Sequence, residues 1–144
     1  MKKLFTAFLC LLVVAGCRIT INDLQGLWTL QSIRPLASGV QNPWTSLLDT
    51  MDVRIYFSEN GDLKIFFVKD GDVTFRLGSF ILLEKEKQLD IRDTGIIFNP
   101  RGELLDVISL NKKELQLEGR YYVHPIAPSA PEDSFLLAAW QLIR

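Results

Sequence analysis

The sequence predicts an all-β protein, a small antiparallel up-and-down β-barrel with one short helix. Three observations indicate this fold. Short segments of alternating apolar and polar residues recur from Leu24 onward, as in half-buried strands. Turn-forming pairs such as Asn60-Gly61 separate these segments. Only residues 44–51 place apolar side chains at near-helical spacing. A closed barrel removes unpaired edge strands, and an open two-sheet sandwich, which buries the same faces, is the alternative.

The predicted strands follow one another through short turns. In chain order they are expected at residues 27–33, 53–57, 63–68, 73–77, 79–83, 89–91, 103–110, 115–123 and 135–144. Asn60-Gly61 predicts a two-residue type I′ turn, because both residues tolerate positive φ. Residues 69–72 form the next turn, and residues 84–87 form a charged one. The segment 79–83 either continues the strand before it or pairs beside it.

Alternation assigns the side chains of the hairpin strands to two faces. The inward set is expected to be Val53, Ile55, Phe57, Leu63, Ile65, Phe67, Val73, Phe75 and Leu77. Eight strands leave room for side chains or for one small ligand, so these residues either fill the barrel or line an apolar cavity. The candidate lining of such a cavity is Ile55, Phe57, Ile65, Phe67, Phe75, Leu77 and Tyr121. The outward set, Tyr56, Phe66, Val68 and Phe80, would form an apolar patch typical of a protein-binding surface.

The first sixteen residues have the pattern of a bacterial secretory signal. Two lysines precede an uncharged apolar run that is short for a bilayer span. The tetrapeptide Val14-Ala15-Gly16-Cys17 resembles the lipobox of bacterial lipoproteins, in which the cysteine is acylated and becomes the first residue of the mature protein. The resemblance implies a signal peptide over residues 1–16, a lipidated tether over 17–23 and one domain over 24–144. The alternatives are an ordinary secretory peptide cut near Gly16 and an apolar N-terminus that is not cleaved.

Lipidation of Cys17 implies attachment to a membrane, which takes two or more acyl chains to be stable. In enteric bacteria, an aspartate directly after the acylated cysteine resembles a signal for retention in the inner membrane. This chain has Arg18 at that position, so the resemblance implies an outer-membrane protein that faces the periplasm. Cleavage leaves 128 residues with a net charge of −3, and it removes Cys10. Neither a disulfide nor nucleic-acid binding is then expected.

Few residues suit catalysis, and the chain is not expected to be an enzyme. With Cys17 acylated no free thiol remains, and the single histidine, His124, lies in the proline-rich segment 124–131. That segment is expected to be a rim loop, since proline cannot donate to a strand ladder. Segment 93–102 is expected to be a second loop with a short strand inside it. The acidic turns at 59–62 and 70–72 do not have EF-hand spacing, so neither a metal nor a cofactor is expected.

The first predicted strand carries Gly26-Leu27-Trp28, which resembles the Gly-x-Trp opening of lipocalins. The chain as a whole is similar to the lipocalin-like lipoproteins of bacterial envelopes. This resemblance implies that Trp28 plugs the closed end of the barrel and that Arg144, from the last strand, lies across its ring. Such a cation-π contact contributes about 0.5–2 kcal/mol.

Two functions follow as hypotheses. The first is an envelope lipoprotein whose barrel binds a small hydrophobic ligand without catalysis. The second is a membrane-tethered protein-interaction or inhibitor module with a packed, ligand-free barrel. The expected partners are therefore the membrane, through the lipid anchor, and either a small hydrophobic molecule or an envelope protein.

Overall fold

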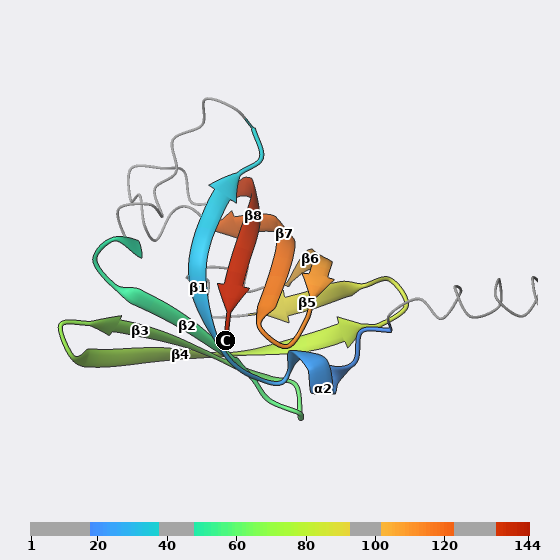
Figure 1. Ribbon diagram of the computed structural model, residues 1–144, viewed down its shortest axis with the longest axis horizontal. Coiled ribbons are helices and arrows are strands. Elements are labelled where there is room, and N and C mark those ends of the chain that lie inside the picture. The colour runs from blue at the N-terminus through green and yellow to red at the C-terminus, as the bar shows by residue number, and fades with distance from the viewer. Residues whose placement is uncertain (1–17, 38–47, 93–101, 123–134) are drawn as a thin grey trace, which may run out of the picture.

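The computed structural model describes residues 18–37, 48–92, 102–122 and 135–144. Within them the chain forms a closed barrel of eight antiparallel strands, in which each strand pairs with its neighbours in sequence (Figure 1). The elements are α2 (Ile21–Leu24), β1 (Gly26–Pro35), β2 (Asp52–Phe57), β3 (Asp62–Lys69), β4 (Asp72–Leu83), β5 (Gln88–Arg92), β6 (Glu103–Leu110), β7 (Glu114–Tyr122) and β8 (Phe135–Ile143). The predicted barrel is confirmed.

Strand β1 closes the barrel by pairing on both sides. Its first half runs antiparallel to β2, with Trp28 opposite Ile55, and its second half pairs with β8, with Ile33 opposite Trp140. A register shift between Leu30 and Ser32 interrupts the pairing with β8. Because one extra residue reverses the alternation of faces, both Leu30 and Ile33 are buried. Closure excludes the open sandwich.

The helical content differs from the expectation. The predicted helix at 44–51 lies partly outside the described residues, and within them Leu48 is helical and a turn follows it. An unpredicted helical turn, α2, precedes the barrel. There the carboxylate of Asp23 accepts hydrogen bonds from the backbone amide and the hydroxyl of Thr20, at 3.0 and 2.8 Å. Ile19 and Ile21 pack against the core.

Two of the hairpin turns each contain a glycine, but they differ in geometry. At the β3–β4 turn, Asp70 and Gly71 have φ values of 51° and 89°, as in a two-residue type I′ turn. At the β2–β3 turn, only Gly61 has a positive φ, 87°, among the described residues of that turn. Its backbone hydrogen bond runs from Ser58 N to Asp62 O, which makes a three-residue loop. The prediction of a type I′ turn at Asn60-Gly61 was therefore wrong.

The assignment of β4 side chains to faces was also wrong. Val73, Phe75 and Leu77, expected inside the barrel, are more than half exposed. The cause is the register of the β3–β4 hairpin, in which Lys69 pairs with Asp72 around a two-residue turn. Directly opposed residues share a face, and Val73 lies opposite the outward Val68.

The same reversal places Phe80 inside, although it was expected outside. Its ring is buried and meets that of Phe57 edge-on, with the centroids 5.0 Å apart. The segment 79–83 is the second half of β4, where it pairs with β5. Strand β4 is thus a single twelve-residue strand, which runs along the lower edge of the barrel in Figure 1.

Candidate functional site

One end of the barrel is closed by Trp28 and Arg144. Trp28 is fully buried, and its indole Nε1 donates to the carbonyl of Leu24 at 2.7 Å. The guanidinium carbon of Arg144 lies 4.2 Å from the centroid of the Trp28 ring. Arg144 Nη2 also donates to the carbonyls of Asp23, at 3.1 Å, and of Gln25. The contact that the lipocalin resemblance implied is present.

Gly26 makes room for this arrangement. Its φ is +123°, and a Cβ built there would lie 3.4 Å from Arg144 Nη2. A side chain at this position would be in van der Waals contact with the arginine, and the positive φ would strain its backbone. The structure therefore brings together the three residues predicted for this end, Gly26, Trp28 and Arg144.

The predicted cavity lining is scattered over three environments. Ile55, Phe57 and Ile65 are fully buried in the core, and Phe67 is half-buried at its margin. Phe75 and Leu77 lie on the outer face, which is the correction described above. The side chain of Tyr121 lies outside the described residues, as do His124 and Cys17.

Among the described residues, the core of the barrel is filled by side chains. Water inside a cavity reaches the residues that line it, whereas a set of core residues from five strands is completely inaccessible. This set is Val53, Phe57, Leu63, Ile65, Leu89, Ile91, Leu105 and Leu115, each 0% exposed. Native cores pack at the density of organic crystals. These residues therefore belong to a packed core and do not surround a ligand.

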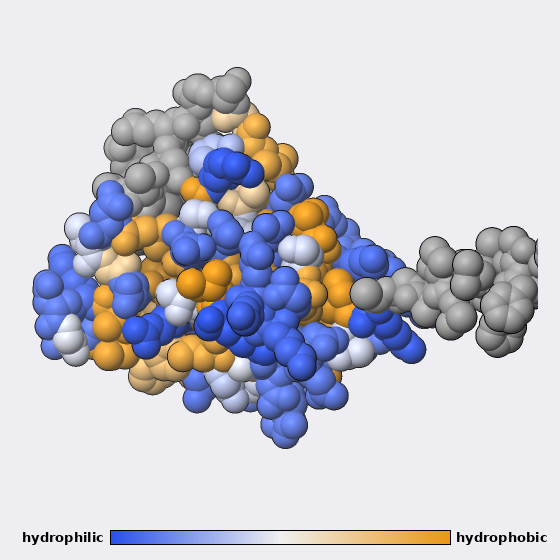
Figure 2. Space-filling view, in the orientation of Figure 1, coloured by the Kyte–Doolittle hydropathy of each residue, from blue (hydrophilic) through white to orange (hydrophobic). Residues whose placement is uncertain are grey.

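An apolar groove of about 620 Å³ lies on the outer face of the barrel. We call it the outer groove, and it is lined by Leu27, Arg54, Tyr56, Lys64, Phe66, Val68 and Val73. Figure 2 shows apolar surface along the lower left of the molecule, where Figure 1 places β3 and β4. The volume falls within the range of about 300–1,000 Å³ that is usual for small-molecule sites.

The outer groove contains most of the predicted outward patch. Tyr56, Phe66 and Val68 line it, as the alternation of β2 and β3 predicted. Leu27, Arg54 and Lys64 were missed, although each occupies an outward position of its strand and was therefore detectable. The two cations are the charged members of the lining. Arg54 Nη2 contacts the Asp52 carboxylate at 3.3 Å, and its buried Nε has no hydrogen-bond partner.

A second, more polar cavity of about 390 Å³ lies beside the β3–β4 turn. It is lined by Met51, Phe67, Lys69, Asp70, Asp72 and Thr74. Phe67 and Thr74 are directly opposed on the inner face of β3 and β4. We call this cavity the mouth pocket. It is the place in the described structure where a predicted lining residue, Phe67, borders open space.

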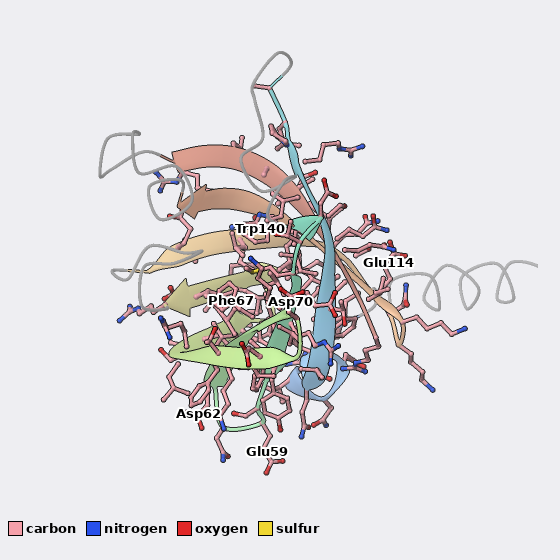
Figure 3. The ribbon with its side chains drawn as sticks, turned by 90° about the vertical axis from the view of Figure 1, so that its left-hand side faces the viewer. Glu59, Asp62, Phe67, Asp70, Glu114 and Trp140 are labelled. Carbon is pink, nitrogen blue, oxygen red and sulfur yellow. The ribbon has the colours of Figure 1, made fainter. Side chains whose placement is uncertain are left out.

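The acidic turns do not converge on a metal site. Asp62 begins β3 and Asp70 follows its end, so they are separated by roughly 26 Å at 3.3 Å per residue. Figure 3 shows Glu59 and Asp62 together at the lower end of the molecule, with Asp70 apart from them. Among the described residues no three His, Cys, Asp or Glu side chains cluster closely enough to hold a metal ion.

Glu103 is the buried charged residue of the described chain. It is 5% exposed, and its Oε1 accepts a hydrogen bond from Arg120 Nε at 2.9 Å. A carboxylate taken out of water requires such a partner. The pair lies on the β6–β7 side of the barrel and borders neither the outer groove nor the mouth pocket.

The geometry of α2 perturbs one titratable group. Hydrogen bonds from the hydroxyl and the backbone amide of Thr20 hold the pKa of the Asp23 carboxyl below its usual range. The neighbouring Arg144 guanidinium acts in the same direction. Both effects stabilise the carboxylate where α2 meets the closed end of the barrel. None of the helices in the described parts of the chain has the length and apolar character needed to cross a bilayer.

Comparison with known proteins identifies no family. No protein-family model matches the chain, and no curated protein matches its sequence. Bovine odorant-binding protein in complex with a selenium-containing odorant aligns with a TM-score of 0.49 and 12% identity, over 90% of this chain and 74% of the bovine chain. The same protein complexed with its natural ligand gives 0.49 and 12%, over 90% and 76%. Likeness at this level carries no argument about ligand or function.

Proposed function

We propose that this chain is a lipid-anchored, non-catalytic binding module of the bacterial cell envelope, and that it binds through the outer groove. The observation that carries this proposal is the packed interior. Ile55, Phe57 and Ile65, which were expected to line a ligand cavity, are at most 1% exposed. The larger apolar concavity is on the outside, so contact with another molecule is best supported there.

The anchor is the part of this proposal that rests on the sequence. Val14-Ala15-Gly16-Cys17 resembles a lipobox, and acylation of Cys17 would hold the barrel at a membrane. Arg18 at the next position favours the outer membrane and the periplasmic side. Mass spectrometry of the membrane-purified protein tests this part. We expect an N-terminal acylated Cys17, and Cys17→Ser should release the protein from the membrane fraction.

Thiol labelling in native envelopes tests the binding surface. With Cys10 cleaved off and Cys17 acylated, a cysteine introduced at Val73 is the single free thiol. Leu137→Cys is the matched control, because Leu137 is similarly exposed, at 54% against 58%, and lies on β8. We expect a water-soluble maleimide to modify Val73→Cys more slowly than Leu137→Cys in envelopes, and both equally fast in the purified protein. Equal rates in envelopes would refute the outer groove as the contact.

A small hydrophobic ligand held at the mouth pocket is the second candidate function. The observation in its favour is the half-buried ring of Phe67, which borders this pocket together with Met51. The pocket is smaller than the outer groove, and four of its six lining residues are polar or charged. For this reason we rank it second.

A further inference from the structure

We infer that the occupant of the outer groove is the lipid bilayer itself, so that the outer face of β3 and β4 lies against the membrane. This inference rests on the lipid anchor proposed above, and it names the partner of the outer groove. Three features of the described residues carry it: the place where the anchor joins the barrel, the apolar character of β4, and the charges that border the groove.

The anchor joins the barrel without a free linker. Cys17 directly precedes Arg18, and consecutive Cα atoms are about 3.8 Å apart. Two residues later the chain is already packed, since Ile19 and Ile21 contact the core. An acylated Cys17 would therefore bring the barrel surface into contact with the bilayer, and the orientation of the barrel decides which face makes this contact.

The anchor emerges at one end of β4. Arg18 Nε lies 3.0 Å from the Glu84 carboxylate, and Glu84 directly follows the last residue of β4. This ion pair is exposed and contributes little energy, but it locates the N-terminal residues. In Figure 1 the described chain begins at the right-hand end of β4, and β4 runs from there along the lower edge of the barrel.

The outer face of β4 carries a row of exposed apolar side chains that leads away from the anchor. Val73, Phe75, Leu77 and Ile81 are between 53% and 58% exposed. From Ile81 to Val73 the row spans roughly 26 Å at 3.3 Å per residue. Phe66 on β3 extends the row sideways, with its ring centroid 6.3 Å from that of Phe75. Apolar patches of this kind mark protein or membrane contacts, and here Arg18, the residue after the proposed anchor, contacts Glu84 at the end of β4.

The charges around the outer groove suit a phospholipid surface. Arg54 and Lys64 line the groove, and no acidic residue does. Long basic side chains bury their stems in apolar surroundings and extend their charges to lipid phosphates. Glu59, in the β2–β3 turn, and Asp62, the first residue of β3, lie near one another (Figure 3), and Asp52 forms an ion pair with Arg54. We therefore expect apolar contact to dominate over attraction to anionic lipid.

Fluorescence quenching in reconstituted vesicles tests the inference. The acylated full-length protein, carrying a fluorophore at Val73→Cys or at Leu137→Cys, is incorporated into phosphatidylethanolamine and phosphatidylglycerol vesicles. Some of the lipids carry a nitroxide on the acyl chain. We expect the label at position 73 to lose more than half of its emission and to be protected from aqueous iodide. The label at position 137 should keep its emission and remain open to iodide.

Vesicle flotation distinguishes a failure of bilayer docking from a failure of the lipid anchor. A protein that floats with the vesicles but shows equal quenching at both positions refutes bilayer docking and leaves the anchor intact. In that case a protein would be the occupant, and crosslinking from position 73 in native membranes would capture it. A protein that lacks the acyl mass and stays in the aqueous fraction refutes the anchor, and docking with it. Phe75→Ser should reduce quenching at position 73, whereas Ile108→Ser, at an equally exposed site on β6, should not.

Discussion

At the scale of single residues, Arg144 joins the last strand to the beginning of the barrel. Its guanidinium covers Trp28 and donates to carbonyls of the α2 segment. Each of these contacts bridges residues about 120 positions apart in sequence, so together they fasten the N-terminal and C-terminal parts of the fold. Without Arg144, the guanidinium that lies over the Trp28 ring would be missing.

Arg144→Met should lower the free energy of unfolding by about 1–2 kcal/mol, because both the cation-π contact and the charged hydrogen bonds are lost. Arg92→Met is the control. Arg92 forms an exposed ion pair with Asp90 at 3.6 Å, and such pairs contribute at most about 1 kcal/mol. Urea unfolding of both variants measures the difference. Equal effects would show that the plug does not stabilise the barrel.

Asp23 makes the free energy of unfolding depend on pH, with lower stability in acid. Its pKa is lowered in the folded protein by Thr20, so folding favours the carboxylate. This stabilisation is complete above the pKa of the unfolded chain, near pH 4, and is lost as the pH falls through the lower folded value. The difference in unfolding free energy between wild type and Asp23→Ala should therefore be largest at neutral pH and shrink in acid. A difference independent of pH would contradict this account.

At the scale of elements, the two glycine turns of β3 differ in what surrounds them. Gly61 and Gly71 have nearly the same φ, 87° and 89°, but a Cβ at Gly61 would lie 3.0 Å from the carbonyl oxygen of Phe80, whereas one at Gly71 would meet nothing within 4 Å. Gly61 O also accepts a hydrogen bond from Phe80 N at 2.8 Å. The β2–β3 turn is thus tied to the second half of β4, whereas a side chain at Gly71 would meet no atom within 4 Å.

Gly71→Ala should cost about 1 kcal/mol, the usual strain of a left-handed alanine. Gly61→Ala should cost clearly more, because the same strain is joined by the crowding against Phe80. Thermal unfolding of the two variants gives the comparison. If Gly71→Ala were the more destabilising change, the assignment of the two turns would be wrong.

The sequence predicted the strand positions better than the faces of the strands. Alternation in β2 and β3 placed Ile55, Phe57 and Ile65 inside correctly, because both strands are regular. The error in β4 arose from placing its apolar residues inside because they are apolar, although Val73 lies opposite the outward Val68. With Asp70-Gly71 as the whole turn, Val68 and Val73 must share a face. In this hairpin the register across the turn, rather than the hydrophobicity of β4, shows which of its side chains face outward.

At the scale of the whole molecule, eight strands leave little space once large side chains point inward. The outward row on β4 consists of side chains that are apolar without being buried, and the sequence could not separate this row from the core because the two have the same composition. The bulge in β1 and the short helix α2 also escaped prediction, since each depends on how β1 meets β8 and the core. Because the core is packed and the apolar groove lies on the outer face, the candidate binding site is on the outside of the barrel and not in its lumen.

Titration with 1-anilinonaphthalene-8-sulfonate, an apolar anionic dye, tests this central claim most directly. Val73 and Thr74 are consecutive exposed residues, one lining the outer groove and the other lining the mouth pocket. Val73→Asp should weaken dye binding by about tenfold or more, equivalent to about 1.4 kcal/mol, because it places a charge in the apolar groove. Thr74→Asp should leave dye binding unchanged. Loss of binding in Thr74→Asp with full binding in Val73→Asp would contradict the account and locate the site at the mouth of the barrel.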